Sequence, residues 1–289
     1  PLPGESLVAF LSDGAFEEQR GSDWAPRWWR AEDCGFAVPI MILNGRRIEQ
    51  RTQIVQEGGA AWLAEDLRHN GFDPVIIDGR DPVAIAWAIV ESEDTLSAFA
   101  AQSNRRYPVK FPYVIAETEK GFGFPGAATD AAPMRPLGGN PREHAQARGA
   151  FNAGAAALFV PEIELENALT VLANHGKNRR SRESEHPMAR RHPASPHLPV
   201  PAWAPTKVSG SAMSSLDRWF VKLAQANPQL RVRIGNPDEL ASNKMGATLA
   251  LLKHRVNVPE PGVPESTHGS VITALNEEAV AAAALANKG

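Results

Sequence analysis

Two side-chain oxygen donors stand at the ends of two apolar runs near the start of the chain. Asp13 follows the run at residues 7–11, and Asn44 follows the run at residues 38–43. Hard divalent cations such as Mg²⁺ prefer oxygen ligands, and a cation that also holds a diphosphate needs only a few of them from the protein. The carboxylate of Asp13, the amide oxygen of Asn44 and the backbone carbonyl of Arg46 could form such a set.

A glycine follows each of the two donors. Gly14 and Gly45 lack a Cβ and would let a phosphate group approach the backbone closely. Asp-Gly and Asn-Gly pairs are also common turn signals. Taken alone, these residues leave a turn and a cation site open as alternatives.

The donors can converge only if a sheet places the two runs side by side. Four apolar segments in the first part of the chain predict strands, and the segments between them have helical patterns. Buried strands that alternate with helices are typical of a parallel sheet covered on both faces, in which ligands bind at the carboxyl ends of the strands. The predicted fold class is therefore α/β. The predicted strands cover residues 7–11, 38–43, 74–79 and 112–118.

Three helices are predicted between these strands. A long helix at residues 82–102 has Asp81 as its expected N-cap, and a shorter one covers residues 60–71. Residues 19–30 are also expected to be helical. They carry three tryptophans that we expect to pack against the sheet or at a subunit interface: Trp24, Trp28 and Trp29.

The composition divides the chain into three parts. Residues 1–175 are expected to form a first α/β domain that ends with a helical pair. Residues 176–211 are rich in proline and arginine and poor in aliphatic residues, which predicts a solvated linker. Acidic residues interrupt the basic run at residues 177–191 and no aromatic residue lies within that run, so a nucleic-acid site is not expected there. Residues 212–289 have the pattern of the start of a second α/β domain.

The totals argue against several classes of function. The formal net charge of −3 over 289 residues gives no field that would attract nucleic acid or a membrane surface. No apolar run approaches the roughly 20 residues that span a bilayer, and the first residues lack a signal-peptide pattern. The single cysteine, Cys34, is expected to be inert and favours a reducing, cytoplasmic compartment. Both ends are expected to be cuts through a longer chain.

Several motifs, in order along the chain, resemble those of phosphoketolases and transketolases. SDGAFEEQ and VPIMILNGRRI are similar to the Asp-Gly and Asn signature of the fold that binds thiamine diphosphate. TEKGFGFPG with PLGG resembles a transketolase loop, and IGNPDELASNKMG resembles a phosphoketolase stretch. ALNEEAV resembles the segment that carries the glutamate activating the cofactor. The resemblance covers residues 6–289 and implies a fragment of such an enzyme.

This resemblance implies a role for each matched residue. Asp13, Asn44 and the carbonyl of Arg46 would bind Mg²⁺ (or Ca²⁺), which bridges the diphosphate of thiamine diphosphate beside Gly14. Glu277 would bind the aminopyrimidine ring of the cofactor and take part in proton transfer. An ordinary first-turn glutamate remains the alternative for Glu277, and its neighbour Glu278 is easily confused with it.

The resemblance also places the substrate and the subunits. Ser242 and Asn243 would contact the phosphate of a sugar-phosphate substrate, although a plain helix N-cap is the alternative for Ser242. Residues 1–175 would be the diphosphate-binding domain without its N-terminal part, and residues 212–289 the start of the pyrimidine-binding domain. The active site would lie at the interface of a homodimer.

Two departures from the family pattern leave the reaction open. Pro133 stands where relatives carry a histidine, and Ser12 stands where they carry a glycine. Proline can neither transfer a proton nor donate a hydrogen bond. The expected reaction is phosphoketolase-type cleavage of a ketose phosphate such as xylulose 5-phosphate. Transketolase-type ketol transfer, isomerisation or epimerisation of a pentulose phosphate, and a non-catalytic cofactor-binding homologue are the alternatives.

Overall fold

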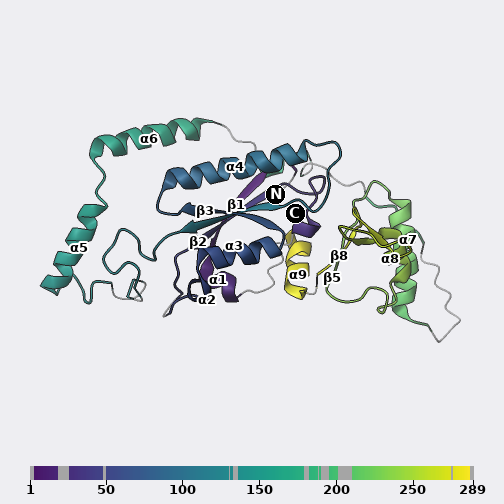
Figure 1. The fold of residues 1–289 in the computed structure, drawn as a ribbon. Helices are drawn as coiled ribbons and strands as arrows, with labels where there is room; N and C mark the ends of the chain where they lie inside the picture. Colours follow the sequence, from purple (N-terminus) through teal and green to yellow (C-terminus); the bar gives the residue numbers. More distant parts are fainter. Residues whose placement is uncertain are drawn as a thin grey trace. The chain divides into compact units, whose positions relative to one another are not determined.

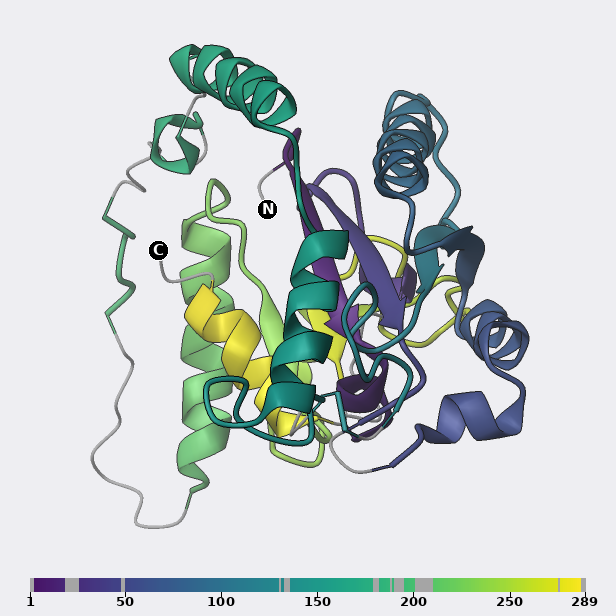
Figure 2. The same cartoon turned by 90° about the vertical axis from the view of Figure 1, so that its left-hand side faces the viewer.

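The fold was analysed in a computed structural model, whose ribbon is shown from two sides in Figures 1 and 2. It forms two compact units, and each is described by itself. Unit 1 contains residues 1–20, 31–105 and 110–183, and unit 2 contains residues 21–30, 106–109 and 184–289. The domain boundaries expected at residues 175 and 211 stay a prediction. The structure describes residues 3–18, 26–47, 50–129, 131–132, 136–178, 182–187, 189, 195–200, 210–274 and 276–286.

Unit 1 is built on a parallel sheet of four strands in the order β1-β2-β4-β3. The residues Ser12 and Ile42 pair in β1 and β2, and Glu117 of β4 pairs with both Leu43 and Asp78. The carboxyl ends of all four strands therefore meet at one edge, and the predicted α/β class is confirmed. The strands are β1 (Ser6–Ser12), β2 (Phe36–Leu43), β3 (Phe72–Asp78) and β4 (Phe111–Glu117).

The central strands β2 and β4 hold the core of unit 1. Val38, Ile40, Val114 and Ile115 are completely buried. Burying an aliphatic side chain of this size contributes about 1.5–3 kcal/mol, so these two strands stabilise the sheet most. The edge strand β1 is different, because Phe10 in it is exposed.

Helices cover both faces of this sheet, with α4 on one face and α3 on the other (Figure 1). The Asp81 carboxylate accepts a hydrogen bond from the Val83 N–H at 2.8 Å, and Pro82 opens α4, as the sequence predicts. Thr52 caps α2 in the same way. The helices are α1 (Asp13–Glu18), α2 (Gln53–Glu57), α3 (Ala60–His69), α4 (Pro82–Ala100), α5 (Ala145–Ala157) and α6 (Glu162–Lys177).

The helix predicted over residues 19–30 is wrong where the structure describes it. Only a single 3-10 turn, η1 (Pro26–Trp28), is present, and the chain then leaves helical geometry. Pro26 explains this, because proline has no N–H to donate and disfavours a helical residue before it. Residues 19–25, including Trp24, lie outside the described residues.

Unit 2 contains a second parallel sheet, in the order β5-β8-β6-β7. Its small core includes Leu240, Leu249 and Val271. Within the described residues of the chain, no helix combines the length and the apolar character needed to cross a membrane. The elements are η2 (Glu183–Glu185), which straddles the division between the units, and then α7 (Ala212–Ala226), β5 (Ile234–Asn236), α8 (Gly246–Leu252), β6 (His254–Arg255), β7 (Glu265–Ser266), β8 (Val271–Thr273) and α9 (Glu277–Ala286).

A buried carboxylate joins α7 to α8. Asp217 on α7 accepts hydrogen bonds from the backbone N–H groups of Ala247 at 3.0 Å and Thr248 at 2.8 Å, which open α8. Burial opposes ionisation of Asp217, but its hydrogen bonds from Thr248 and Ala247 outweigh burial and hold its pKa below the ordinary value. The ionised carboxylate therefore stabilises the folded unit.

We expect the Asp217→Asn variant to unfold with about 1–3 kcal/mol less free energy at neutral pH, because the two N–H donors lose a charged acceptor. The pKa of Asp217 is depressed, so its contribution is present above the ordinary aspartate pKa of about 4 and is lost as the pH falls through the lower folded value. Urea unfolding at several pH values should show the two proteins converging in acid. The exposed Asp94→Asn change is the control, and an equal loss there would contradict this role.

Candidate functional site

Asp13 lies at the carboxyl end of β1, where it is also the first residue of α1. Its side chain has no exposed surface. Its Oδ2 accepts a hydrogen bond from the Gly45 N–H at 2.7 Å, and its Oδ1 accepts one from the Gly14 N–H at 2.9 Å. The structure therefore brings Asp13 against the loop that follows β2, next to Asn44.

Asn44 and Arg46 form the turn that Asp13 contacts. The Oδ1 atom of Asn44 accepts a hydrogen bond from the Arg46 N–H at 3.0 Å, and Gly45 between them has a φ of +76°. That conformation strains residues with a Cβ. The Asn-Gly pair thus does make a turn, whereas the Asp-Gly pair opens α1, and together they set three oxygen-bearing groups at one edge of the sheet.

The glycines of the site are packed against side chains. A Cβ on Gly14 would lie 3.0 Å from the Cβ of Arg47, and a Cβ on Gly45 would lie 3.1 Å from Cγ2 of Val55. Both glycines are therefore required for close packing between α1, the loop after β2 and α2. The approach of a phosphate group to these glycines stays a prediction.

Glu17 belongs to the same edge, although it is not among the predicted site residues. Its Oε1 accepts a hydrogen bond from the Ile54 N–H at 2.6 Å, and its side chain is 7% exposed. Its Oε2 is buried without a hydrogen-bond partner among the described residues, 4.0 Å from Nη1 of Arg47. Its spacing of one helical turn from Asp13 could have identified it, because such residues share a helix face.

The two buried carboxylates make this edge electrostatically unfavourable. Burial raises the pKa of Asp13 above its ordinary value, and the charge of Glu17 raises it further, against the opposing hydrogen bonds from Gly45 and Gly14. Each carboxylate oxygen can accept more than one hydrogen bond or ligand. A hard cation would relieve the repulsion, so the donor set fits Mg²⁺ chemically.

Positive charge also reaches this edge from the loop after β4. Lys120 donates a hydrogen bond from Nζ to the backbone carbonyl of Arg47 at 2.9 Å. A cavity of about 510 Å³ lies beside this loop, at the ends of β3 and β4. Asp78 and Arg80 line it as an ion pair at 2.8 Å, and the hydrogen bond from Arg80 lowers the pKa of Asp78.

The residues predicted in unit 2 are exposed. Glu277 and Glu278 both lie in the first turn of α9, where Asn276 accepts a hydrogen bond from the Ala279 N–H at 2.9 Å. Glu277 is therefore free to reach a ligand and is also placed where the helix dipole favours a glutamate.

Ser242 and Asn243 lie in the exposed turn before α8. Ser242 donates a hydrogen bond from Oγ to the Glu239 carbonyl at 3.2 Å, and Asn243 donates to the same carbonyl. The N-cap of α8 is Met245, so the alternative interpretation of Ser242 as the N-cap is wrong. Both side chains remain candidates for a substrate contact.

Two further observations bear on the predicted chemistry. Pro133 lies outside the described residues. In the parts of the chain that the structure describes, no three His, Cys, Asp or Glu side chains cluster closely enough to hold a metal ion. The candidate cation site does not need such a cluster, because an amide and a backbone carbonyl supply two of its three donors.

Comparison with known proteins supports the resemblance in one part of the chain. Residues 214–288 match the family described as D-xylulose 5-phosphate/D-fructose 6-phosphate phosphoketolase. The predicted resemblance to phosphoketolases is confirmed for this segment, which holds Ser242, Asn243 and Glu277. A comparison with curated proteins finds no match.

One similar solved structure is a transketolase from Leishmania mexicana. It covers 92% of this chain at 15% sequence identity, with a TM-score of 0.42. The chain spans 38% of the length of that transketolase.

We expect the Gly45→Ala variant to unfold with about 1–2 kcal/mol less free energy, because alanine is strained at a φ of +76°. Contact of the new Cβ with Val55 adds to the cost. The control is Gly149→Ala in α5, where a Cβ meets nothing within 4 Å and helix propensity favours alanine by up to about 1 kcal/mol. Chemical denaturation measures both, and a stable Gly45→Ala protein would contradict the turn geometry.

Proposed function

We propose that this chain is part of a thiamine-diphosphate-dependent enzyme that cleaves a carbon–carbon bond of a ketose phosphate such as xylulose 5-phosphate. The observation that carries the proposal is the contact of the buried Asp13 carboxylate with the turn at Asn44–Arg46. The phosphoketolase match of residues 214–288 supports the reaction class. The proposed protein is a cytoplasmic homodimer, as the sequence analysis predicts.

In this proposal Asp13, Asn44 and the Arg46 carbonyl hold Mg²⁺, which binds the diphosphate of the cofactor. When bound, thiamine diphosphate supplies the carbanion that carbon–carbon cleavage requires. Lys120 adds positive charge beside the same edge through its hydrogen bond to the Arg47 carbonyl. The three oxygen donors are hard ligands, which suit Mg²⁺ or Ca²⁺ better than zinc.

The residues of unit 2 have proposed roles at the reacting end of the cofactor and at the substrate. The exposed Glu277 carboxyl would hold a proton at the aminopyrimidine ring. The Ser242 hydroxyl and Asn243 amide would donate hydrogen bonds to the phosphate of the sugar. All three lie in the segment that matches phosphoketolases.

A second candidate function is motivated by Pro133. A proline at that position cannot transfer a proton, so the competing outcomes are ketol transfer, isomerisation or epimerisation of a pentulose phosphate, and cofactor binding without turnover. Product analysis with xylulose 5-phosphate separates them. Cleavage shortens the five-carbon skeleton without an aldose acceptor, ketol transfer requires an acceptor, and epimerisation keeps all five carbons.

The experiment that tests the proposal is calorimetry of thiamine diphosphate binding at the natural full length of this protein. We expect binding with Mg²⁺, no binding with EDTA, and at least tenfold weaker binding for Asp13→Ala, because a charged metal ligand is lost. The matched control is Asp94→Ala, an exposed aspartate on α4. A folded protein that binds no thiamine diphosphate with Mg²⁺ would refute the proposal.

A further inference from the structure

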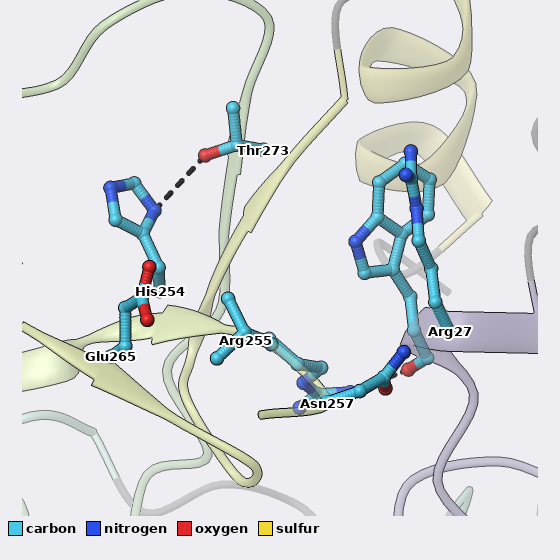
Figure 3. A pocket seen from close by; sticks show the side chains of 8 residues that line it. Arg27, His254, Arg255, Asn257, Glu265 and Thr273 are labelled. Atoms are coloured by element: carbon cyan, nitrogen blue, oxygen red, sulfur yellow. Dashed lines mark hydrogen bonds between the residues drawn. The ribbon is translucent and has the colours of Figure 1, made fainter. Parts of the chain in front are cut away.

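We propose that unit 2 carries a binding site for a small organic anion that also bears hydroxyl groups, separate from the residues assigned to thiamine diphosphate. The site is a pocket of about 410 Å³, within the range of small-molecule sites of about 300–1,000 Å³. Figure 3 shows Arg27 on one side of it, with His254 and Glu265 on the other. All its lining residues belong to unit 2.

Arg27 forms the cationic side of the pocket. Its guanidinium lies over the ring of Trp28, with 4.2 Å between the guanidinium carbon and the ring centroid. The side chain is exposed and its guanidinium makes no hydrogen bond to any described residue. An arginine placed over an aromatic ring still presents the N–H groups of its planar guanidinium, which suits a carboxylate or a phosphate.

Arg255 holds the turn that carries Arg27 in place. It is 6% exposed, and its Nη1 donates to the Trp28 carbonyl at 3.0 Å while its Nε donates to the Gly269 carbonyl at 2.9 Å. The buried guanidinium therefore holds the turn that carries Arg27 and adds a second positive charge beside the pocket.

The rest of the pocket offers hydrogen-bond acceptors. The Oδ1 atom of Asn257 is buried without a partner among the described residues. Buried acceptors are nearly always paired, so this one calls for a donor from a ligand or a bound water. Glu265 accepts a hydrogen bond from the Glu260 N–H at 2.8 Å through Oε2, and its Oε1 can accept another.

His254 completes this acceptor side. Its Nδ1 lies 3.1 Å from Oγ1 of Thr273, which fixes the ring and leaves Nε2 for a ligand. A ligand with hydroxyl groups can meet Asn257, Glu265 and His254, while its anionic group meets Arg27. A bare anion would leave Asn257 unsatisfied and lie near the Glu265 charge, and a cation would meet two arginines.

Calorimetry with three small probes tests this ligand class. Glycerol phosphate carries both features, inorganic phosphate carries only the charge, and glycerol carries only the hydroxyl groups. We expect glycerol phosphate to bind at least about fivefold more tightly than phosphate, because its hydroxyl groups add one or two neutral hydrogen bonds. We expect glycerol not to bind detectably. Equal affinity for phosphate and glycerol phosphate, or no binding of either, would overturn the proposal.

Variants locate the probe in the pocket. Arg27→Gln should weaken glycerol phosphate about tenfold or more, because a charged hydrogen-bonding group is lost. Asn257→Leu should remove part of the advantage of glycerol phosphate over phosphate while leaving phosphate affinity unchanged. The control is Arg218→Gln, which removes an exposed arginine of α7 in the same unit. Equal losses in Arg27→Gln and Arg218→Gln would refute the site.

The titrations are made with EDTA and without thiamine diphosphate, and then repeated with Mg²⁺ and the cofactor. Affinity for glycerol phosphate that is unchanged by the cofactor supports a separate site. Competition by thiamine diphosphate would show that the pocket belongs to the cofactor site and would overturn the inference. Since the first titration needs no cofactor, failure of the proposed enzyme function leaves this result interpretable.

Discussion

The hydrogen bond from the Gly45 N–H to the buried carboxylate of Asp13 is the contact on which the first unit's functional edge depends. It joins the residue that follows β1 to the turn that follows β2, so the segments after two neighbouring parallel strands meet at one point. The other contacts of this edge follow from that junction. Arg47 packs on Gly14, Lys120 bonds to the Arg47 carbonyl, and Glu17 reaches the N–H of Ile54. Without an acceptor at position 13, the N–H groups of Gly14 and Gly45 would be buried without hydrogen-bond partners.

Continuous apolar runs were sufficient to predict the strands of unit 1, because the central strands β2 and β4 are buried on both faces. They were not sufficient to predict the order β1-β2-β4-β3. Phe10 on β1 and Ile76 on β3 are as apolar as the central residues, yet both are exposed at the edges of the sheet. The hydrophobic pattern therefore indicates which segments become strands. Which strands lie next to each other depends on the path of the connecting segments, and no local sequence pattern indicates that path.

The segment around Arg30 shows where sequence patterns fail. Arg30 is 1% exposed, lies over the Tyr107 ring at 4.4 Å, and donates to the backbone carbonyls of Thr267 at 2.7 Å and Arg27 at 2.8 Å. Every residue has a backbone carbonyl, so the sequence gives no residue type that would identify these carbonyl acceptors of a buried arginine. The same holds for Arg255. Glu17 is the opposite case, because its spacing from Asp13 is visible in the sequence.

Buried charges are compensated differently in the two units, and this difference bears on function. In unit 2 the guanidinium groups of Arg30 and Arg255 are buried against carbonyl acceptors. In unit 1 the carboxylates of Asp13 and Glu17 lie one helical turn apart, and Oε2 of Glu17 has no hydrogen-bond partner among the described residues. Apolar residues at these positions would leave the N–H groups of Gly14, Gly45 and Ile54 without acceptors. Uncharged acceptors would satisfy those donors without repulsion between two carboxylates, whereas a cation held beside the carboxylates would relieve that repulsion. This argument favours the cation-binding proposal over a homologue that has kept the fold alone.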